Sequence, residues 1–340
     1  MSVNIKDVAK LANVSISTVS RVIHNAPNLR PETIRVVKDA IDKLNFVPNR
    51  VAQNLGSGYF SCIGVLSTRS SNQTFGNPYF SIAIQSIAEI CEKYNHDILL
   101  NFSTNEEREF EKCISMVNEK VVRGFILLSS RLNDILIEKL TELNFPFVVI
   151  GRVLNEQLSD KIYTVDTDNV NDCKEAVNYL INLNHRNIAC IHAPLKYVVS
   201  KERLDGYIEA HKENNIPVNY SLIADGGYTL DDAYLATKKI LSGPIRPTAI
   251  FATDDIKALG VYKALKEFNL KIPDDVSLIG HNNYESAGFL EPPLTTIDVP
   301  VEHLGSLAAE MLFQIINGKH PQKRIILNTK LIVRDSCKAL

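Results

Sequence analysis

The chain has 340 residues, 45% of them apolar, and a formal net charge of −2 at pH 7. This length and apolar content are enough for two or three packed units with a substantial core. No apolar run approaches the length needed to cross a membrane, and residues 1–4 lack the basic and apolar regions of a signal peptide. We therefore expect a cytoplasmic protein rather than a membrane-bound or secreted one.

Charge is distributed unevenly along the chain. Up to residue 58, eight basic residues accompany four acidic ones, so this segment is net positive and the remainder is net negative. A basic head on an acidic body indicates that the head alone has a polyanionic partner.

The sequence contains no pattern that predicts a metal or a cofactor. The six cysteines show no C-x-x-C or other metal-binding spacing, and several lie in apolar stretches, where a reduced cysteine behaves as a small hydrophobe. Glycine-rich phosphate loops and the common hydrolase motifs are also absent from the sequence. We therefore expect free thiols, no cofactor and no metal.

Residues 5–12 and 15–24 are predicted to form two short helices that are separated by a tight turn. Apolar residues recur every three or four positions in both segments, which gives each helix one buried face. Asn4 precedes the first helix as a capping residue, and the other face of the second presents hydroxyls and Arg21 to solvent. This pattern is typical of a helix-turn-helix with an exposed reading helix, although an ordinary two-helix corner of a small bundle shares it.

A third helix is predicted over residues 30–44, where Pro31 suits the first turn and an apolar stripe completes the core. Residues 48–60 follow as a hinge helix and linker, in which Asn49 can cap one or two turns and Gly56 can end them. A helix this short is marginal alone in water, so we expect it to form only against a partner.

The first 55 residues resemble the DNA-binding segment of the Lac repressor family of bacterial transcription regulators. The matching blocks are Ile5-Lys-Asp-Val-Ala9, Val14-Ser15, Thr18-Val-Ser-Arg21 and Pro48-Asn-Arg-Val-Ala52 with Leu55. The resemblance implies that Ile16, Ser17 and Arg21 read bases in the major groove and that Leu55 wedges into the minor groove. Arg30 departs from the family, which usually has a Ser or Thr cap there, and is expected to contact phosphate instead. The expected DNA contacts are Ser15, Ile16, Ser17, Thr18, Arg21, Asn25, Arg30, Asn49, Arg50, Ala52 and Leu55.

From residue 60 onward, apolar strand candidates alternate with amphipathic helices. The strand candidates are residues 62–66, 97–101, 124–128, 147–150, 187–191, 221–224, 249–252 and 276–279. Such alternation predicts parallel sheets that are covered on both faces, here as two doubly wound subdomains divided near Tyr163. The fold class is therefore α/β, with a small all-α head, a hinge helix and a body of two subdomains with a cleft between them.

This body resembles the periplasmic-binding-protein-like effector domain of the same family, from about residue 61 to the end. The blocks that carry the resemblance are Asn77-Pro-Tyr-Phe80, Arg203-Leu-Asp-Gly-Tyr207, Asp255-Ile-Lys-Ala-Leu-Gly260 and Pro292-Pro-Leu-Thr-Thr-Ile297. We expect a DNA-binding domain at residues 1–47, a hinge at 48–60 and an effector-binding and dimerisation domain at 61–340, with crossovers between subdomains near the C-terminus.

Ligands of open α/β sheets bind at the carboxyl ends of the strands. That rule selects an effector site made of Thr68, Tyr79, Phe80, Ser129, Arg152, Arg203, Tyr228, Asp254 and Asn282. The resemblance itself implies effector contacts at Arg203, Tyr228, Asp254 and Tyr79 or Phe80. An aromatic face surrounded by Arg, Asp and Asn suits a sugar ring, which stacks while its hydroxyls form paired hydrogen bonds.

Several of these residues have structural alternatives. Asp255, beside Asp254, is favoured as a helix cap, Phe80 is equally suited to the core, and Arg152 is equally suited to pairing with a surface acid. Many relatives have Asp where this chain has Asn282; an amide keeps sugar binding but disfavours a cationic ligand.

Details at Tyr79-Phe80, Gly151-Arg152 and residues 227–232 are similar to the maltose-operon repressors of Gram-positive bacteria. We therefore expect a repressor of sugar-utilisation genes with a maltose- or maltodextrin-type effector. The alternatives are another sugar, a phosphoprotein co-regulator, and a sugar-binding receptor without a DNA role; the last conflicts with the basic head and the missing signal peptide.

Catalysis is not expected. The carboxylate pairs Asp166 with Asp168 and Asp254 with Asp255 are of the kind that glycosidases use, but neighbours on a loop rarely hold the separation that this chemistry needs.

A homodimer is expected, because one reading helix contacts too few base pairs and a two-fold operator matches a two-fold protein. The hinges should become ordered only on DNA, and a ligand in the cleft should change the angle between subdomains and hence DNA affinity.

Overall fold

The computed structural model describes residues 3–23, 29–46 and 60–340. The chain divides into two compact units, residues 1–60 and 61–340, and each is described by itself below. The expected hinge over residues 48–60 lies outside the described residues except for its last residue, Phe60.

The head contains the three expected helices, α1 (Ile5–Ala12), α2 (Ile16–Ile23) and α3 (Pro31–Lys43). Each contributes apolar side chains to one small core, which consists of Val8, Ala9, Ala12, Val19, Val22, Val37, Ala40 and Phe46. The expected cap at Asn4 is present, because its side chain accepts a hydrogen bond from the Lys6 N–H at 2.8 Å. Asn13 ends α1 in the left-handed conformation, with φ of 51°, and begins the turn into α2.

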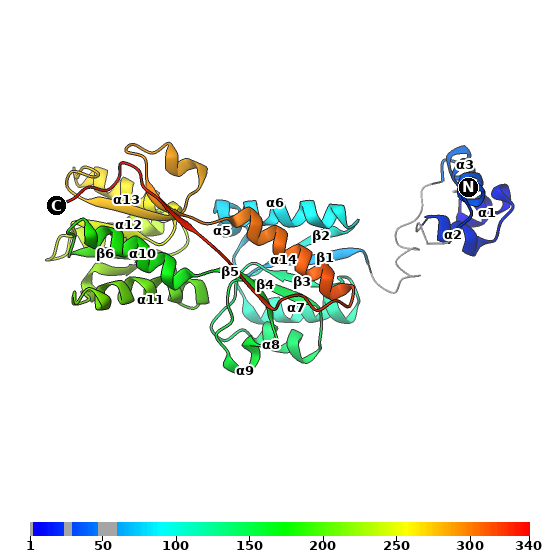
Figure 1. Ribbon diagram of the computed structural model, residues 1–340, viewed down its shortest axis with the longest axis horizontal. Helices are drawn as coiled ribbons and strands as arrows, with labels where there is room; N and C mark the ends of the chain where they lie inside the picture. The colour runs from blue at the N-terminus through cyan, green and yellow to red at the C-terminus, as the bar shows by residue number, and fades with distance from the viewer. Residues whose placement is uncertain (1–2, 24–28, 47–59) are drawn as a thin grey trace. The chain divides into compact units, whose positions relative to one another are not determined.

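The first lobe of the body is built on a sheet of six parallel strands in the order β11-β5-β4-β3-β1-β2. Its strands are β1 (Cys62–Ser67), β2 (Asp97–Phe102), β3 (Phe125–Leu127), β4 (Phe147–Ile150), β5 (Tyr163–Thr167) and β11 (Arg324–Leu327). Its helices are α5 (Ser71–Phe75), α6 (Pro78–Lys93), α7 (Glu106–Asn118), α8 (Ile135–Glu142), α9 (Glu156–Ser159) and α14 (Val301–Ile316). Helices α6 and α14 cover one face of the sheet, and α7 and α8 cover the other (Figure 1).

The second lobe repeats this plan with the order β12-β10-β9-β8-β6-β7, in which only β12 is antiparallel to its neighbour. Its strands are β6 (Ile188–His192), β7 (Ile223–Asp225), β8 (Ala249–Ala252), β9 (Ser277–Asn282), β10 (Thr295–Asp298) and β12 (Lys330–Ile332). Helices α10 (Asn169–Asn182) and α11 (Val198–Glu213) pack together, as do α12 (Leu230–Leu241) and α13 (Asp255–Glu267), and the two pairs lie on opposite faces of the sheet (Figure 1).

The two-lobed, doubly wound α/β fold is thus as expected, but its boundary differs from the expectation. The sequence was divided near Tyr163, whereas β5 pairs with β4 and β11 and belongs to the first lobe. The chain crosses between lobes after β5, after β10 and after β11. The strand expected at residues 221–224 is also displaced, because a 3-10 turn, Tyr220–Leu222, precedes the strand Ile223–Asp225.

Asparagine ends most of the described helices. Besides α1, six helices of the head and body are followed by an Asn in the left-handed conformation. A left-handed residue at this position lets the backbone satisfy the terminal carbonyl groups of the helix. These residues are Asn45, Asn95, Asn144, Asn184, Asn215 and Asn269. Asn tolerates this conformation better than other non-glycine residues, so the sequence itself marks where these helices stop.

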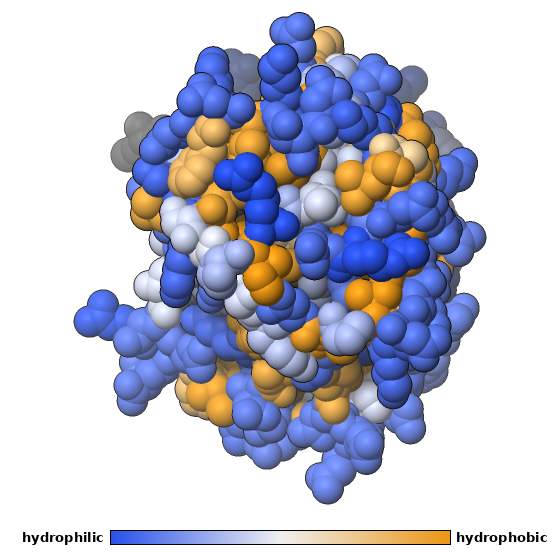
Figure 2. Space-filling model, turned by 90° about the vertical axis from the view of Figure 1, so that its left-hand side faces the viewer, coloured by the Kyte–Doolittle hydropathy of each residue, from blue (hydrophilic) through white to orange (hydrophobic). Residues whose placement is uncertain are grey.

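Among the described residues, no helix combines the length and the apolar character that a bilayer crossing requires. The end of the second lobe shown in Figure 2 is mainly hydrophilic, with apolar side chains in separate areas.

The close approach of α6 and α14 depends on Gly305. A Cβ at this position would overlap the Ser86 hydroxyl and lie 2.7 Å from the Ala83 carbonyl oxygen. We expect Gly305→Ala to lower the free energy of unfolding by about 1–2 kcal/mol, because overpacking outweighs the gain in helix propensity. Gly288→Ala is the matched control, since nothing lies within 4 Å of a Cβ there. Urea unfolding of both variants measures the difference, and equal stabilities would contradict the packing argument.

Candidate functional sites

The residues that were expected to read DNA bases lie on α2, where their exposure can be compared with that of the core residues. Val19 and Val22 are buried in the core of the head, whereas Ser15, Ser17 and Arg21 are exposed and Ile16 is 45% exposed. An exposed isoleucine at the start of a short helix leaves an apolar side chain available for a partner surface. The arrangement therefore places polar, apolar and cationic groups together on the outer face of one helix.

The hydroxyls of this surface are held in place by each other. Ser15 Oγ accepts a hydrogen bond from the Thr18 N–H at 3.1 Å, which caps the start of α2. Ser15 Oγ also lies 2.8 Å from the hydroxyl oxygens of Ser17 and Thr18. This network fixes the first turn of α2, the part that enters the groove in helix-turn-helix proteins.

The remaining expected DNA contacts are only partly described. Arg30 precedes α3 and makes no side-chain capping bond, so its exposed guanidinium is not used by the helix start. The other residues lie outside the described residues; these are Asn25, Asn49, Arg50, Ala52 and Leu55.

In the body, a cavity of about 90 Å³ lies where the carboxyl ends of the two sheets face each other. Seven of the nine expected effector residues line it, which are Tyr79, Phe80, Ser129, Arg203, Tyr228, Asp254 and Asn282. Phe80 is 4% exposed and belongs to the hydrophobic core as well as to the cavity lining. Residues that were selected because they follow the ends of strands therefore surround one cavity, with side chains from both lobes.

Thr68 and Arg152 are not part of the cavity lining. The Thr68 hydroxyl lies 3.0 Å from Ser129 Oγ, and its carbonyl oxygen accepts a hydrogen bond from Tyr197 OH at 3.1 Å, so it lies behind the wall of the cavity. Arg152 forms an ion pair with Glu202 of α11, with Nη1 and Oε1 3.1 Å apart. The alternative of an acidic partner is thus correct for Arg152, but the acid is buried and belongs to the other lobe.

Asp254, rather than Asp255, caps α13. Asp254 Oδ1 accepts a hydrogen bond from the Ile256 N–H at 2.8 Å. Asp255 is buried within α13, where its carboxylate accepts hydrogen bonds from the N–H groups of His281 and Tyr284 and from the Thr296 hydroxyl. The cap assignment made from the sequence was therefore wrong by one residue, because capping geometry requires the last residue before the helix.

Asp254 also connects the two lobes beside the cavity. Its Oδ2 accepts hydrogen bonds from Asn77 Nδ2 of the first lobe at 3.1 Å and from Asn282 Nδ2 at 3.0 Å. Tyr284 OH donates to Asn77 Oδ1 at 2.8 Å and so adds a second contact between the lobes. A ligand that reaches Asp254 or Asn77 therefore acts on groups that hold the lobes together.

Arg69 is the main residue of this site that the sequence analysis missed. It directly follows Thr68 at the end of β1 and is 8% exposed. Its guanidinium carbon lies 4.3 Å from the ring centre of Tyr197 and 4.7 Å from that of Phe80. This cation–π stack occupies the aromatic face that was expected to hold a sugar. The strand-end rule points to Arg69 as well as Thr68, so the signal was present in the sequence.

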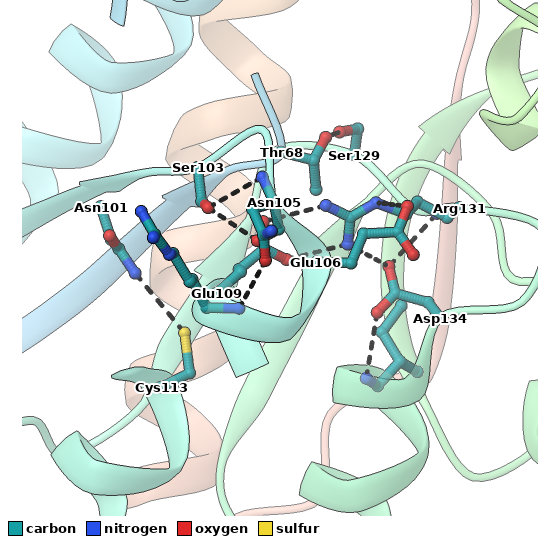
Figure 3. A network of polar contacts seen from close by, with 12 residues as sticks. Thr68, Asn101, Ser103, Asn105, Glu106, Glu109, Cys113, Ser129, Arg131 and Asp134 are labelled. Atoms are coloured by element: carbon teal, nitrogen blue, oxygen red, sulfur yellow. Dashed lines mark hydrogen bonds and ion pairs between the residues drawn. The ribbon is translucent and has the colours of Figure 1, made fainter. Parts of the chain in front are cut away.

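The loop that carries Ser129 is fixed by the buried guanidinium of Arg131 (Figure 3). Arg131 makes a two-bond ion pair with Glu109, with N–O distances of 2.9 and 3.0 Å, and pairs with Glu106 at 3.1 Å. The same loop joins the second lobe through a β-bridge between Arg131 and Tyr197. Paired and hydrogen-bonded buried charges hold a unique geometry, so Ser129 lies on a rigid support.

Asp166 of β5 is a buried carboxyl at the crossing between the lobes. Its Oδ1 accepts hydrogen bonds from the Thr167 N–H at 2.8 Å and from Asn169 Nδ2 at 3.1 Å, whereas its buried Oδ2 has no partner among the described residues. Burial raises the pKa of Asp166 to about 7, and the negative charge of Glu202 adds to the shift. Near neutral pH this carboxyl therefore exists in both protonation states.

The described residues contain no group of His, Cys, Asp and Glu side chains that could hold a metal ion. All six cysteines are free thiols. Burial raises the pKa of the Cys113 thiol to about 12, so it remains protonated at neutral pH and is a poor nucleophile.

We expect Asp166→Asn to stabilise the protein at pH 8 but not at pH 4. Since the pKa of Asp166 is about 7 in the folded chain against an ordinary 3.8, the folded state binds more protons between these values. The free energy of unfolding of the unchanged protein therefore falls by up to about 4 kcal/mol as pH rises from about 4 to 7, and it stays low above pH 7. The Asn variant lacks this loss. Thermal unfolding at both pH values measures the effect, with exposed Asp160→Asn as control. The same stability difference at pH 4 and pH 8 would contradict the assignment.

Comparison with known proteins places both units of the chain in one family. The family model described as "Bacterial regulatory proteins, lacI family" matches residues 4–49, and a periplasmic binding protein-like domain matches residues 177–337. The chain is 35% identical over 342 residues to the HTH-type transcriptional repressor PurR of Vibrio vulnificus (strain CMCP6), and the match covers 99% of each chain.

Solved structures agree with this relationship. The Lac repressor dimer bound to operator and the anti-inducer ONPF matches with a TM-score of 0.87 and 26% identity over 100% of both chains. A complex of the transcriptional regulator CelR with cellobiose matches with a TM-score of 0.76 and 29% identity over 98% of this chain and 99% of that one. These relatives are transcriptional regulators and not enzymes, as the sequence analysis expected. The chain belongs to the lacI family of bacterial regulatory proteins and is a DNA-binding transcriptional repressor.

Proposed function

We propose that the chain represses genes of sugar utilisation and that a small hydroxylated ligand in the cavity between the lobes controls its affinity for operator DNA. The observation that carries this proposal is the convergence of Asn77 and Asp254, from different lobes, on the cavity wall at 3.1 Å. A ligand that replaces this contact changes the relative stability of closed and open lobes, which is how hinge-type regulators respond.

A sugar is the ligand class that the lining favours. Aromatic rings lie beside amide, hydroxyl and charged groups, which suits a ring with several hydroxyls. The related CelR structure is a complex with cellobiose, which supports a carbohydrate as the ligand of this chain. Within that class we propose a maltose- or maltodextrin-type sugar; another sugar and a phosphoprotein co-regulator are the alternatives.

Operator binding is proposed to use the outer face of α2 in a homodimer. Ile16 can contact a thymine methyl group, and Arg21 can bond a guanine edge with two N–H groups. The dimer is supported by the Lac repressor structure, which is a dimer on its operator. Two copies place two reading helices on a site of two half-sites.

Arg21→Ala tests this reading surface. If Arg21 makes a two-bond base contact, the variant should lose about 1–3 kcal/mol of operator affinity while affinity for unrelated DNA changes little. Lys38→Ala is the control, because this exposed α3 residue carries the same charge and should affect both kinds of DNA equally, if at all. Gel shifts with the chain's own upstream DNA and with random DNA measure both affinities. An equal loss on both DNAs for Arg21→Ala would sink the base-reading role.

Titration with maltose tests the effector. We expect binding heat in calorimetry at millimolar maltose or below, and a change in operator affinity when maltose is added to the gel shift. If maltose changes the affinity for operator DNA by some factor, operator DNA must change the affinity for maltose by the same factor, because coupling between sites is reciprocal. No heat and no change in operator affinity would remove maltose as the effector.

A further inference from the structure

Three cationic side chains are buried around the cavity between the lobes. Arg69 lies at the end of β1 and Arg203 on α11, and both are 8% exposed; Lys257 lies on α13 and is 3% exposed. All three line the cavity. Burial lowers the pKa of Lys257, the charges of Asp254 and Asp225 raise it, and those of Arg69 and Arg203 lower it, so these groups lie within one another's electrostatic field.

None of these cations forms an ion pair with a carboxylate of the described residues, since all their hydrogen-bond partners are neutral. Arg69 Nη1 donates to Ser129 Oγ at 3.3 Å, and Lys257 Nζ donates to the Gly227 carbonyl oxygen at 2.6 Å. Arg203 donates to the side chains of Asn169 and Asn282 and to the Thr253 carbonyl oxygen. Buried charges are costly unless a counter-charge compensates them, so this arrangement favours an anion.

The carboxyl groups of the lining are fewer than its cations. Within the described residues, the lining contains two carboxyl groups, those of Asp254 and Asp166, against three cations. Asp254 is already bonded to Asn77, Asn282 and the start of α13. Among the described lining residues, cationic side chains therefore outnumber carboxyl groups by three to two.

The cations also retain unused donors. An arginine has five N–H groups and a protonated lysine three. Within the described residues only one donor of Arg69 and one of Lys257 is used. The stack on Phe80 and Tyr197 engages the face of the Arg69 guanidinium and leaves its N–H edges for an acceptor.

Resting on the proposed function, we propose that the effector is a phosphorylated sugar, with its phosphoryl group held by Arg69, Lys257 and Arg203. A neutral sugar would displace water from three cations without compensating them. A phosphate monoester carries about −1.5 to −2 charges at pH 7 and three strong acceptor oxygens, which matches the excess charge and the unused donors. The sugar hydroxyls then bond the amides and carboxyls around Asp254.

Calorimetry of the full chain with matched ligand pairs tests this assignment. The probes are glucose, ribose, fructose and maltose, each beside its phosphate ester, together with glucuronate and inorganic phosphate. We expect at least one ester to bind tenfold or more tightly than its parent sugar and to change operator affinity in a gel shift. Esters that all bind no better than their parents would overturn the inference.

Two variants remove the charges separately. Arg69→Gln and Lys257→Gln should each lower affinity for the preferred ester at least tenfold while changing that for the parent sugar less. Lys239→Gln is the matched control, because this exposed α12 lysine lies outside the cavity and its loss should change neither affinity. Circular dichroism and thermal unfolding establish whether each variant is folded, and one folded variant is enough for the test. An ester preference that survives in a folded Arg69→Gln or Lys257→Gln variant would also overturn the inference.

The remaining outcomes separate this inference from the proposed function. A neutral sugar that changes operator affinity while its ester binds no better would overturn the phosphate assignment and leave the proposed function standing. If glucuronate binds as tightly as the best ester, the assignment of a phosphoryl group is wrong. If inorganic phosphate binds as tightly, the assignment of a sugar is wrong. Operator affinity that responds to no probe would count against both proposals.

Discussion

The carboxylate of Asp254 connects the two lobes of the body, the start of a helix and the cavity wall. One oxygen caps α13, and the other accepts hydrogen bonds from Asn77 of the first lobe and from Asn282 of the second. Helix capping fixes the direction of this side chain, so the contact across the lobes has a defined geometry. A ligand that bonds to Asp254 replaces a contact between lobes, and the balance between closed and open lobes then depends on occupancy.

The cationic side chains behind the cavity wall differ in their partners from those that face the cavity. Behind the wall, Arg131 and Arg152 are paired with buried acids, which stabilises the loop after β3 and the crossing into the second lobe. Facing the cavity, Arg69, Arg203 and Lys257 have only neutral partners among the described residues. Paired buried charges fix a structure, whereas unpaired ones favour binding of a counter-charge. The body thus holds its frame with internal ion pairs, whereas the three cations at the cavity have no ion-pair partner among the described residues.

The head follows a different physical plan. Its core is small, and the first turn of α2 is fixed by hydroxyl groups that bond to each other and to the Thr18 N–H. The polar and cationic groups of its outer face are therefore presented from a short helix whose first turn is fixed. The chain combines this reading unit with a two-lobed body of the kind that the lacI family uses for regulation.

The sequence by itself determined the head, the two doubly wound lobes and seven residues of the cavity lining. These follow from local patterns: apolar spacing defines helices and strands, and residues just after parallel strands meet at one edge. The tertiary structure decided what depends on pairing between distant segments. β5, β10, β11 and β12 were not among the predicted strands, and β11 and β12 pair with β5 and β10. The stacking of Arg69 on Tyr197 arises only when the lobes pack, since no local pattern encodes which neighbour from the other lobe a side chain meets.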